Sequence, residues 1–295
     1  MNVAIGWLLA ITACGYGFIE TGGDLSLLWQ PHEWLIIVGA SIGALLAGNK
    51  PRDLKNLGRA LCRIFVPARS NQKDNTELLS LMFQLLQKFN RDGALSVDAE
   101  ISNPQASALF KKYPRVLRKK ALMTFIRDYV IMLIDGKASA SHIEAVFSQE
   151  IELLHKEAIE PSNSLGVIAD SLPAFGIVAA ITGVILTLSS LTGNVAPSLV
   201  GLGMAKALVG TLAGVFLSYA VVGPLATVLK QRADADVRAY EAVKEIIIAH
   251  YHNFDPLVAV EYGRKALYSD QRPSMDELSE YVMSSSGQNI RTSKS

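Results

Sequence analysis

The segment from Ser171 to Leu229 constrains the fold of this chain most, because its 59 residues contain only one charged side chain, Lys206. A short break, TGNVAPS, divides it into two apolar runs. A helix that crosses a bilayer core needs about 20 mostly apolar residues. No soluble domain needs two consecutive apolar runs of this length. The segment therefore predicts two membrane-spanning helices, and neither contains an Asp, Glu or His.

Two more apolar runs lie near the N-terminus. Residues Asn2–Ile19 carry no charge, and neither do Trp34–Asn49, whose helix we expect to begin a little earlier, near Pro31. A secretory signal peptide is the alternative for the first run, but no Lys or Arg precedes it, as such a signal requires. The composition, 50% hydrophobic and 19% charged, suits a mixture of spans and soluble segments. The predicted fold is all-α: a four-span polytopic membrane protein with a helical cytoplasmic domain.

The loops predict the orientation of these spans. Loops 20–33 and 189–198 contain no Lys or Arg, whereas Lys230 and Arg232 follow the fourth span. Basic residues also follow the second span closely: Lys50, Arg52, Lys55, Arg59 and Arg63. Basic residues near span ends stay in the cytoplasm. Both termini and the long segment 50–170 are therefore predicted to be cytoplasmic.

The chain is predicted to have five parts. Spans one and two occupy 1–49, a helical cytoplasmic domain 50–170, spans three and four 171–229, a helical extension 230–283 and a disordered polar tail 284–295. Within the cytoplasmic domain, residues 75–89 place apolar side chains at helical spacing. The helix of span four is expected to continue into the extension.

No residue pattern supports an enzyme. The five histidines do not pair with Cys, Asp or Glu at a metal-ligand spacing. A phosphate-binding glycine loop and a nucleophile elbow are both missing. The formal net charge of +1 gives no signal for nucleic-acid binding. We therefore expect no catalytic residue, metal or cofactor, and membrane lipid as the surroundings of the spans.

Besides large apolar residues, the spans contain threonines, which add hydroxyl groups, and small residues. The hydroxyls of Thr182 and Thr211 either bond to a carbonyl one turn earlier or face an ion path. A hydroxyl cannot hold a proton at neutral pH, so it can coordinate an ion but cannot relay one alone. If these helices move ions, the carboxylate has to come from another chain. The small residues, among them the G-x-x-x-G from Gly210 to Gly214, serve either packing within the chain or an interchain or pore-facing role.

Two prolines lie near the cytoplasmic ends of the last two spans. Pro173 is expected early in its helix, where a proline is tolerated. Pro224 falls where the helix is expected to continue, so it removes a backbone bond and should kink the helix. Together they predict a hinge that transmits events in the spans to the cytoplasmic domain.

Several long motifs resemble the MotA family, the ion-conducting stator subunits of the bacterial flagellar motor. They are QPHEWLIIVGASIGALLAGN, DSLPAFGIVAAITGV, KALVGTLAGVFLSYAVVGPLATVL and AVEYGRKALYSDQRPSMDELSEYV. The resemblance covers nearly the whole chain apart from its tail. It implies a pentameric ring around two MotB chains in the bacterial inner membrane, at the base of the flagellum. MotB would supply the ion-binding aspartate and the peptidoglycan anchor, and the ring would push on the rotor protein FliG.

The resemblance also assigns roles to residues. Pro173 and Pro224 match the prolines that couple the ion site to the cytoplasmic loop, and Thr211 matches the threonine facing MotB. The rotor-contacting motif corresponds to Asn90-Arg91-Asp92-Gly93 with Asp98 and Glu100, and Asn90 departs from members with a basic residue there. The expected basic contact is Arg91, with Lys88 as an alternative, and the acidic contact is Asp98 or Glu100. Without the resemblance, these charged residues would be interpreted as an ordinary solvated end of a helix.

Other transport functions remain open at this point. A three-span, ExbB- or TolQ-like energiser of outer-membrane transport is the main alternative, and a non-motor channel or a membrane scaffold is another. Four spans and the motif GRKALYSDQRP favour the motor subunit. The residues themselves are compatible with protons or sodium as the transported ion, and the overall resemblance favours protons.

Overall fold

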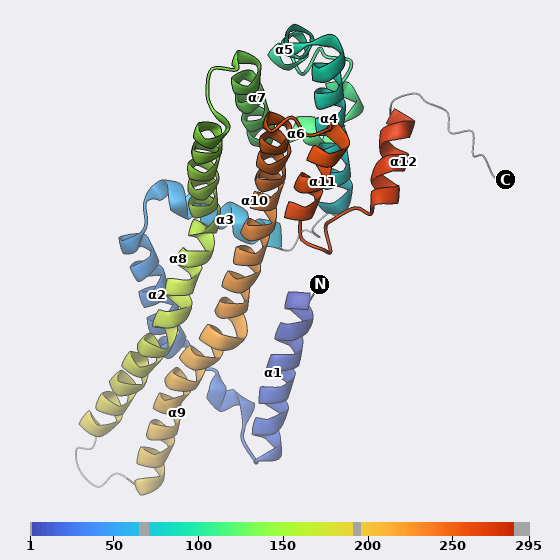
Figure 1. Ribbon diagram of the computed structural model, residues 1–295. Coiled ribbons are helices and arrows are strands. Elements are labelled where there is room, and N and C mark those ends of the chain that lie inside the picture. The colour runs from blue at the N-terminus through green and yellow to red at the C-terminus, as the bar shows by residue number, and fades with distance from the viewer. Residues whose placement is uncertain (1, 65–70, 191–195, 286–295) are drawn as a thin grey trace, which may run out of the picture. The chain divides into compact units, whose positions relative to one another are not determined.

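A computed structural model of the chain describes residues 2–64, 71–190 and 196–285, and these residues form helices and connecting segments without a strand. Four helices are long and apolar enough to cross a membrane (Figure 1). They lie within Val3–Glu20, Leu25–Gly48, Ala140–Ser189 and Pro197–Tyr251. The all-α prediction with four candidate spans is confirmed. The predicted disordered tail lies outside the described residues from 286 onward.

Contacts divide the chain into two compact units. Residues 1–67 and 159–232 form the membrane unit, and residues 68–158 and 233–295 form the second unit. Residues 159–170 thus group with the spans, although the sequence analysis assigned them to the cytoplasmic segment. The short elements of the membrane unit are α1 (Asn2–Glu20), the 3₁₀ turn η1 (Leu25–Leu28), α2 (Pro31–Gly48) and α3 (Pro51–Ile64). The start of α2 at Pro31 is the one expected.

Two very long helices contribute to both units. The helices are α8 (Ala140–Ser189) and a continuous helical run made of α9 (Pro197–Phe216), the π-helical segment η3 (Leu217–Val222) and α10 (Gly223–Tyr251). The expected continuation of span four into a further helix is confirmed. The other elements of the second unit are α4 (Asn71–Asp92), α5 (Ala94–Ser102), η2 (Phe110–Lys112), α6 (Pro114–Arg118), α7 (Lys120–Asp135), α11 (Pro256–Ala266) and α12 (Met275–Ser285).

Glycines bring α8 and α9 into direct backbone contact. A Cβ placed on Gly176 would lie 2.7 Å from the carbonyl oxygen of Gly210, and one on Gly214 would lie 2.6 Å from that of Leu172. Backbone atoms cannot move aside as a side chain can, so only glycine fits at these two positions. Ala179 is fully buried on the same face of α8. The small-residue motif therefore serves packing within this chain.

Both prolines of the predicted hinge remove a backbone donor from a long helix. Pro173 was expected early in a helix, and this is wrong because α8 runs without a break from Ala140 to Ser189. Its missing N–H therefore removes a hydrogen bond from the helix interior. Pro224 follows directly on η3, where the N–H of Gly223 donates to the carbonyl of Ser218. The helix thus accommodates Pro224 by widening into a π-helical segment, a feature frequently found at functional sites.

A basic helix follows the second span. In α3, Leu57 and Ile64 are buried, while Arg52, Lys55, Arg59 and Arg63 are exposed. Arg232 donates to the carbonyl oxygens of Arg63 at 2.5 Å and Ile64 at 3.0 Å, and so satisfies acceptors at the C-terminus of α3. An apolar face beside a basic face is typical of helices that lie along a membrane surface.

The second unit has its own hydrophobic core. It is built mainly from α4, α7, the first turns of α8, and α10. Aromatic rings form its centre, where Tyr129 stacks on Phe147 with centroids 3.4 Å apart and Phe125 packs beside both rings. The hydroxyl of Tyr129 donates to Glu150 at 2.7 Å. This unit therefore buries its largest side chains without leaving that polar group unpaired.

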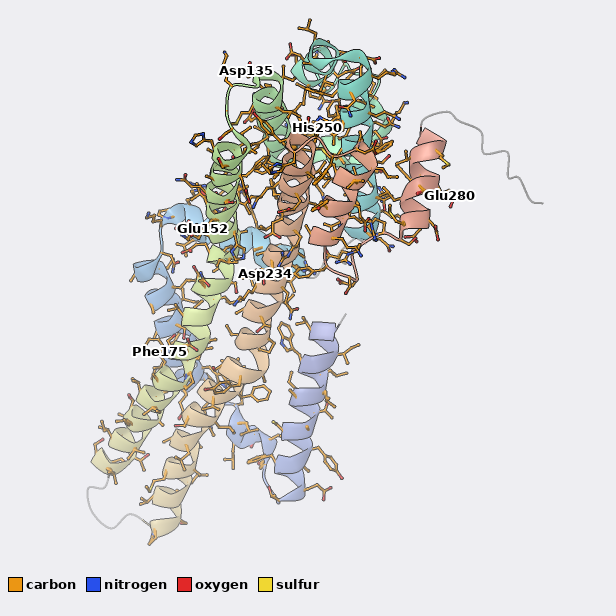
Figure 2. All side chains as sticks on the ribbon, viewed as in Figure 1. Asp135, Glu152, Phe175, Asp234, His250 and Glu280 are labelled. Carbon is orange, nitrogen blue, oxygen red and sulfur yellow. The ribbon has the colours of Figure 1, made fainter. Side chains whose placement is uncertain are left out.

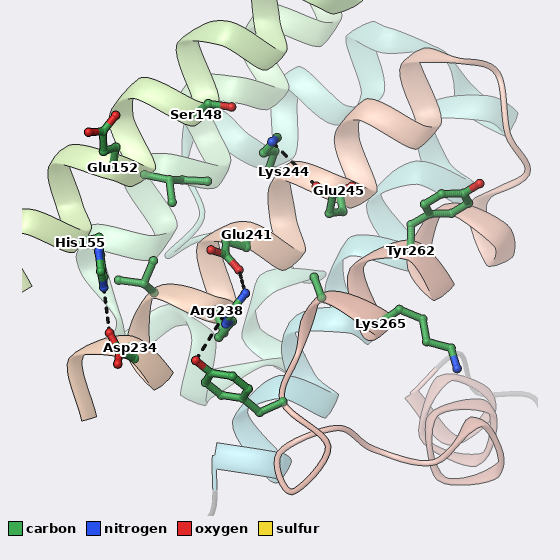
Figure 3. Close-up of a pocket in the computed structure, with 14 residues that line it drawn as sticks. Ser148, Glu152, His155, Asp234, Arg238, Glu241, Lys244, Glu245, Tyr262 and Lys265 are labelled. Atoms are coloured by element: carbon green, nitrogen blue, oxygen red, sulfur yellow. Dashed lines mark hydrogen bonds and ion pairs between the residues drawn. The ribbon is translucent and has the colours of Figure 1, made fainter. Parts of the chain in front are cut away.

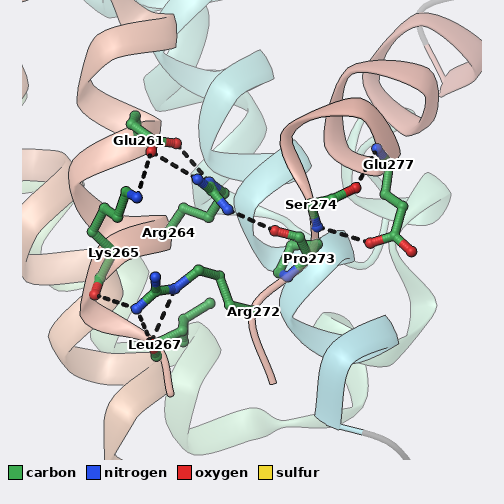
Figure 4. Close-up of polar contacts among 8 residues, drawn as sticks. All are labelled: Glu261, Arg264, Lys265, Leu267, Arg272, Pro273, Ser274 and Glu277. Atoms are coloured by element: carbon green, nitrogen blue, oxygen red, sulfur yellow. Dashed lines mark hydrogen bonds and ion pairs between the residues drawn. The ribbon is translucent and has the colours of Figure 1, made fainter. Parts of the chain in front are cut away.

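The motif GRKALYSDQRPSMDELSEYV forms a polar corner between α11 and α12 (Figure 4). The buried guanidinium of Arg264 pairs with Glu261 at 2.6 Å and donates to the carbonyl of Pro273 at 2.8 Å. Arg272 donates to the carbonyl of Leu267 at 2.8 Å. These contacts fix the backbone of an irregular connection, so the motif has a structural role.

The core also contains a buried histidine whose pKa is shifted by its surroundings. His250, labelled in Figure 2, is buried, packs edge-on against Phe89 with centroids 5.4 Å apart, and has no partner for its Nδ1 among the described residues. Burial lowers the pKa of His250 below its ordinary value. The folded chain therefore keeps this ring neutral at a pH where the unfolded chain would protonate it.

We expect acid to destabilise the second unit through His250. Stability should be complete above the ordinary imidazole pKa of about 6.5 and fall at lower pH, by at most about 1.4 kcal/mol per pH unit, until the folded-state pKa is reached. His250→Phe should remove this part of the slope. The measurement is the thermal midpoint of the full chain in detergent between about pH 5 and 8. His252→Phe, at an exposed site, is the matched control, and equal slopes in both variants would contradict the assignment.

Candidate functional site

The two threonines of the predicted ion path behave differently. Thr182 on α8 donates to the carbonyl of Val178 at 2.9 Å, the local bond expected of a structural hydroxyl. Thr211 on α9 is half-buried, and its hydroxyl bonds to no other described residue. Thr211 is therefore free to form a hydrogen bond with a ligand or a partner chain. Thr182 would first have to break its hydrogen bond to the carbonyl of Val178.

Both helix irregularities lie beside the tight α8–α9 crossing. Pro173 precedes Gly176 by three residues, and η3 begins three residues after Gly214. Each is thus about one helical turn from the place where the two backbones touch. A change in the contacts at this crossing would therefore act directly on Pro173 and η3, where the regular helix hydrogen bonds are altered.

A carboxyl group that the sequence analysis assigned to a loop lies inside the membrane unit. Glu33 belongs to the first turn of α2, and only 9% of it is exposed. A Cβ on Gly210 would lie 3.1 Å from its Oε2, and one on Gly183 would lie 3.5 Å from its Oε1. The side chain of Glu33 thus packs against glycines of both α8 and α9.

The predicted rotor-contacting residues occupy the corner between α4 and α5. Gly93 joins these helices with a φ of +82°, a backbone conformation that favours glycine. Arg91 forms a paired contact with its neighbour Asp92, with Nε to Oδ1 at 2.8 Å, and its side chain is 78% exposed. The hydrogen bond from Arg91 lowers the pKa of Asp92. Both charges therefore remain ionised and accessible at neutral pH.

The two alternative contacts, Lys88 and Glu100, pair with each other. The Nζ of Lys88 lies 2.5 Å from the Oε1 of Glu100, and Ser107 also donates to this carboxylate. The bond from Lys88, and then that from Ser107, lowers the pKa of Glu100. Asp98 is partly exposed and forms no ion pair within the described part of the chain. The corner thus leaves Arg91 and Asp98 accessible, while the ion pair between Lys88 and Glu100 joins α4 to α5.

A cavity of about 880 Å³ opens between α8, α10 and α11 in the second unit (Figure 3). His155 lies 2.8 Å from Asp234, and Arg238 pairs with Glu241 and donates to the hydroxyl of Tyr268 at 3.3 Å. These ionisable side chains therefore already have partners in the wall of the cavity. Within the described ranges, no group of three or more His, Cys, Asp or Glu residues is placed to hold a metal ion.

Sequence reasoning missed Glu33 and the pairing of Lys88 with Glu100. The signal for Glu33 was present, because Pro31 starts a helix and puts Glu33 in its first turn. Its contact with glycines on two distant helices could not be inferred from spacing. The pairing of Lys88 with Glu100 depends on the turn at Gly93, which brings two helices together.

Two family models match the chain. One, described as motility protein A N-terminal, matches residues 4–93, and the other, described as the MotA/TolQ/ExbB proton channel family, matches residues 116–242. The motility protein A of Salmonella typhimurium is 39% identical over 282 residues, which cover 96% of this chain and 95% of that protein. The chemotaxis protein LafT of Vibrio parahaemolyticus is 33% identical over 95% of this chain and 98% of that protein.

Solved structures share the fold. The C. jejuni MotAB structure matches with a TM-score of 0.72 at 22% identity, over 93% of this chain and 98% of that chain. The flagellar MotAB stator complex of Bacillus subtilis matches with a TM-score of 0.68 at 22% identity, over 88% and 92%. Together with the whole-length relatives, these findings show that the chain belongs to the motility protein A family, within the MotA/TolQ/ExbB proton channel family.

Proposed function

We propose that this chain is an ion-conducting stator subunit of a bacterial flagellar motor, located in the inner membrane. The observation that carries the proposal is its 39% identity to a motility protein A over 96% of its length. Four candidate spans and relatives named for motility favour this function over an ExbB- or TolQ-like energiser. A channel family implies transport and not catalysis, so an enzymatic activity is not part of the proposal.

The partner in this proposal is a MotB-type chain. The structural neighbours are named as MotAB complexes, which supports a B-type subunit as the partner here. Two copies of that subunit would stand inside a ring of five copies of this chain. The partner would carry the ion-binding aspartate, and the unpaired hydroxyl of Thr211 on α9 would face it. Thr182 would join the path on release of its carbonyl bond.

Protons are the proposed ion. Each charge that crosses 100 mV supplies about 2.3 kcal/mol, so every step must have a low barrier. Binding a proton removes the charge of the partner's aspartate, which is costly inside a bilayer. The change in contacts would act at the α8–α9 crossing and pass through Pro173 and η3 toward the cytoplasm.

The rotor contact in this proposal is the corner between α4 and α5. Arg91 and Asp98 would meet charges of opposite sign on a rotor protein of the FliG type. The orientation follows from the basic residues: α3 would lie along the cytoplasmic surface of the membrane, with both termini in the cytoplasm.

Complementation tests the function. We expect the chain, expressed with its own B-type partner in cells that lack their stator A subunit, to restore swimming. Swimming speed should be insensitive to external sodium at fixed pH and should collapse when a protonophore dissipates the proton gradient. A chain that reaches the membrane with its partner but restores no rotation would contradict the stator function. Speed that rises with sodium would contradict only the choice of ion.

Charge reversal tests the rotor contact. Arg91→Glu and Asp98→Lys should each reduce swarming severalfold without reducing the amount of protein in the membrane, and reversing charges on the rotor protein should restore part of the loss. Arg127→Glu is the matched control, because Arg127 also pairs with the next residue, Asp128, on an exposed helix face. If the control variant reduces swarming as strongly, the effect does not come from the corner.

Replacement of the prolines tests the coupling. Pro173→Ala and Pro224→Ala restore backbone donors, so they should stiffen the helices beside the crossing and lower torque while complexes still assemble. Pro161→Ala, also inside α8 but about four turns from Gly176, should leave torque unchanged. The measurement is the torque of single motors with bound beads. Normal torque in both Pro173→Ala and Pro224→Ala would exclude the hinge.

A further inference from the structure

The membrane unit holds a carboxyl group that the ion path described above does not use. Glu33 lies within the candidate span Leu25–Gly48, and only 9% of it is exposed. Its Oε2 is buried and has no hydrogen-bond partner among the described residues. The backbone amide of Gly210 lies close to the carboxyl group, but no cationic side chain among the described residues pairs with it. A buried negative charge without a positive partner is costly both in a protein interior and in a bilayer. This burial indicates that Glu33 binds a cation when it occupies this position.

The surroundings of Glu33 suit a proton better than a metal ion. The two carboxyl oxygens of Glu33 lie against Gly210 and Gly183, where a Cβ would approach them to 3.1 Å and 3.5 Å. Among the described residues, no group of three or more His, Cys, Asp or Glu side chains is placed to hold a metal ion together with Glu33. A sodium ion would need several oxygen ligands, as hard cations do. A proton needs only one carboxyl oxygen.

Glu33 also lies at the level of the threonines proposed for the ion path. Gly210 directly precedes Thr211, and Gly183 directly follows Thr182. Successive residues of a helix differ in direction by about 100°, so Glu33 and the Thr211 hydroxyl approach α9 from different sides. The carboxyl group of Glu33 therefore lies against the residues next to both threonines, on another side of α9 than the Thr211 hydroxyl.

We propose that Glu33 is a proton-binding site of this chain that exchanges protons with the ion path at the level of Thr211. The carboxylate takes up one proton to become the neutral acid, and returns it when a carboxylate or water on the path accepts it. The role in transport rests on the proposed stator function, whereas proton binding by Glu33 can be measured without it. The channel would then hold an ionisable group from this chain in addition to the aspartate of its partner.

Motor speed against external pH tests the transport role. Glu33→Gln keeps the shape of the side chain but cannot ionise. It should assemble, turn severalfold more slowly than the parent and respond less to external pH, while Glu33→Asp should retain part of both properties. Glu20→Gln, at an exposed carboxylate on the end of α1, is the control and should behave as the parent. Parent-like speed and pH response in Glu33→Gln would overturn the proposal.

Infrared spectroscopy tests proton binding in the purified full-length protein, whether or not the motor turns. A carboxylic acid C=O band at neutral pH should disappear in Glu33→Gln and persist in Glu20→Gln. A parent chain that shows this band but drives no rotation would refute the stator function and leave Glu33 as a proton-binding group. A spectrum unchanged by Glu33→Gln would overturn the proton-binding site, even in a chain that turns the motor normally.

Discussion

The membrane unit depends on the backbone contact between α8 and α9. Gly176 and Gly214 approach so closely that a Cβ on Gly214 would lie 2.9 Å from the Cα of Gly176. Lipid tails provide no hydrophobic force between helices, so close packing of small residues is what holds such a pair together. This contact leaves Pro173 and η3 at its edges, and it forms the surface against which Glu33 packs.

The sequence predicted the architecture well because its signals are local. Runs of uncharged residues identify the candidate spans, and Pro31 and the apolar stripe in 75–89 identify helices. The prediction that Pro173 lies early in its helix was wrong because α8 begins at Ala140, long before the apolar run begins at Ser171. The polar part of α8 satisfies the same backbone hydrogen bonds as the apolar part, so hydropathy cannot detect where that helix begins.

The site was only partly predictable for a different reason. The family resemblance proposed Arg91 as the basic contact, with Lys88 as an alternative, and left Asp98 and Glu100 open as the acidic contact. Their availability depends on which of them pair, and the pairing of Lys88 with Glu100 requires the turn at Gly93. The residue pattern gave Thr182 and Thr211 the same two alternatives, and their hydrogen bonds differ in the folded chain. Glu33 meets Gly183 and Gly210 across about 150 residues or more, a relation that only the folded chain contains.

The turn at Gly93 has a consequence for how such a protein can change partners. Its backbone conformation is one that glycine alone adopts readily, so the geometry of the corner depends on this residue and not on the charges beside it. The positions around it, such as Asn90 and Arg91, lie on regular helix and face solvent. Their charges can be exchanged without altering the main chain. Under the proposed rotor contact, such a corner would adapt to changes in the rotor surface through its side chains alone, while the fold stays the same.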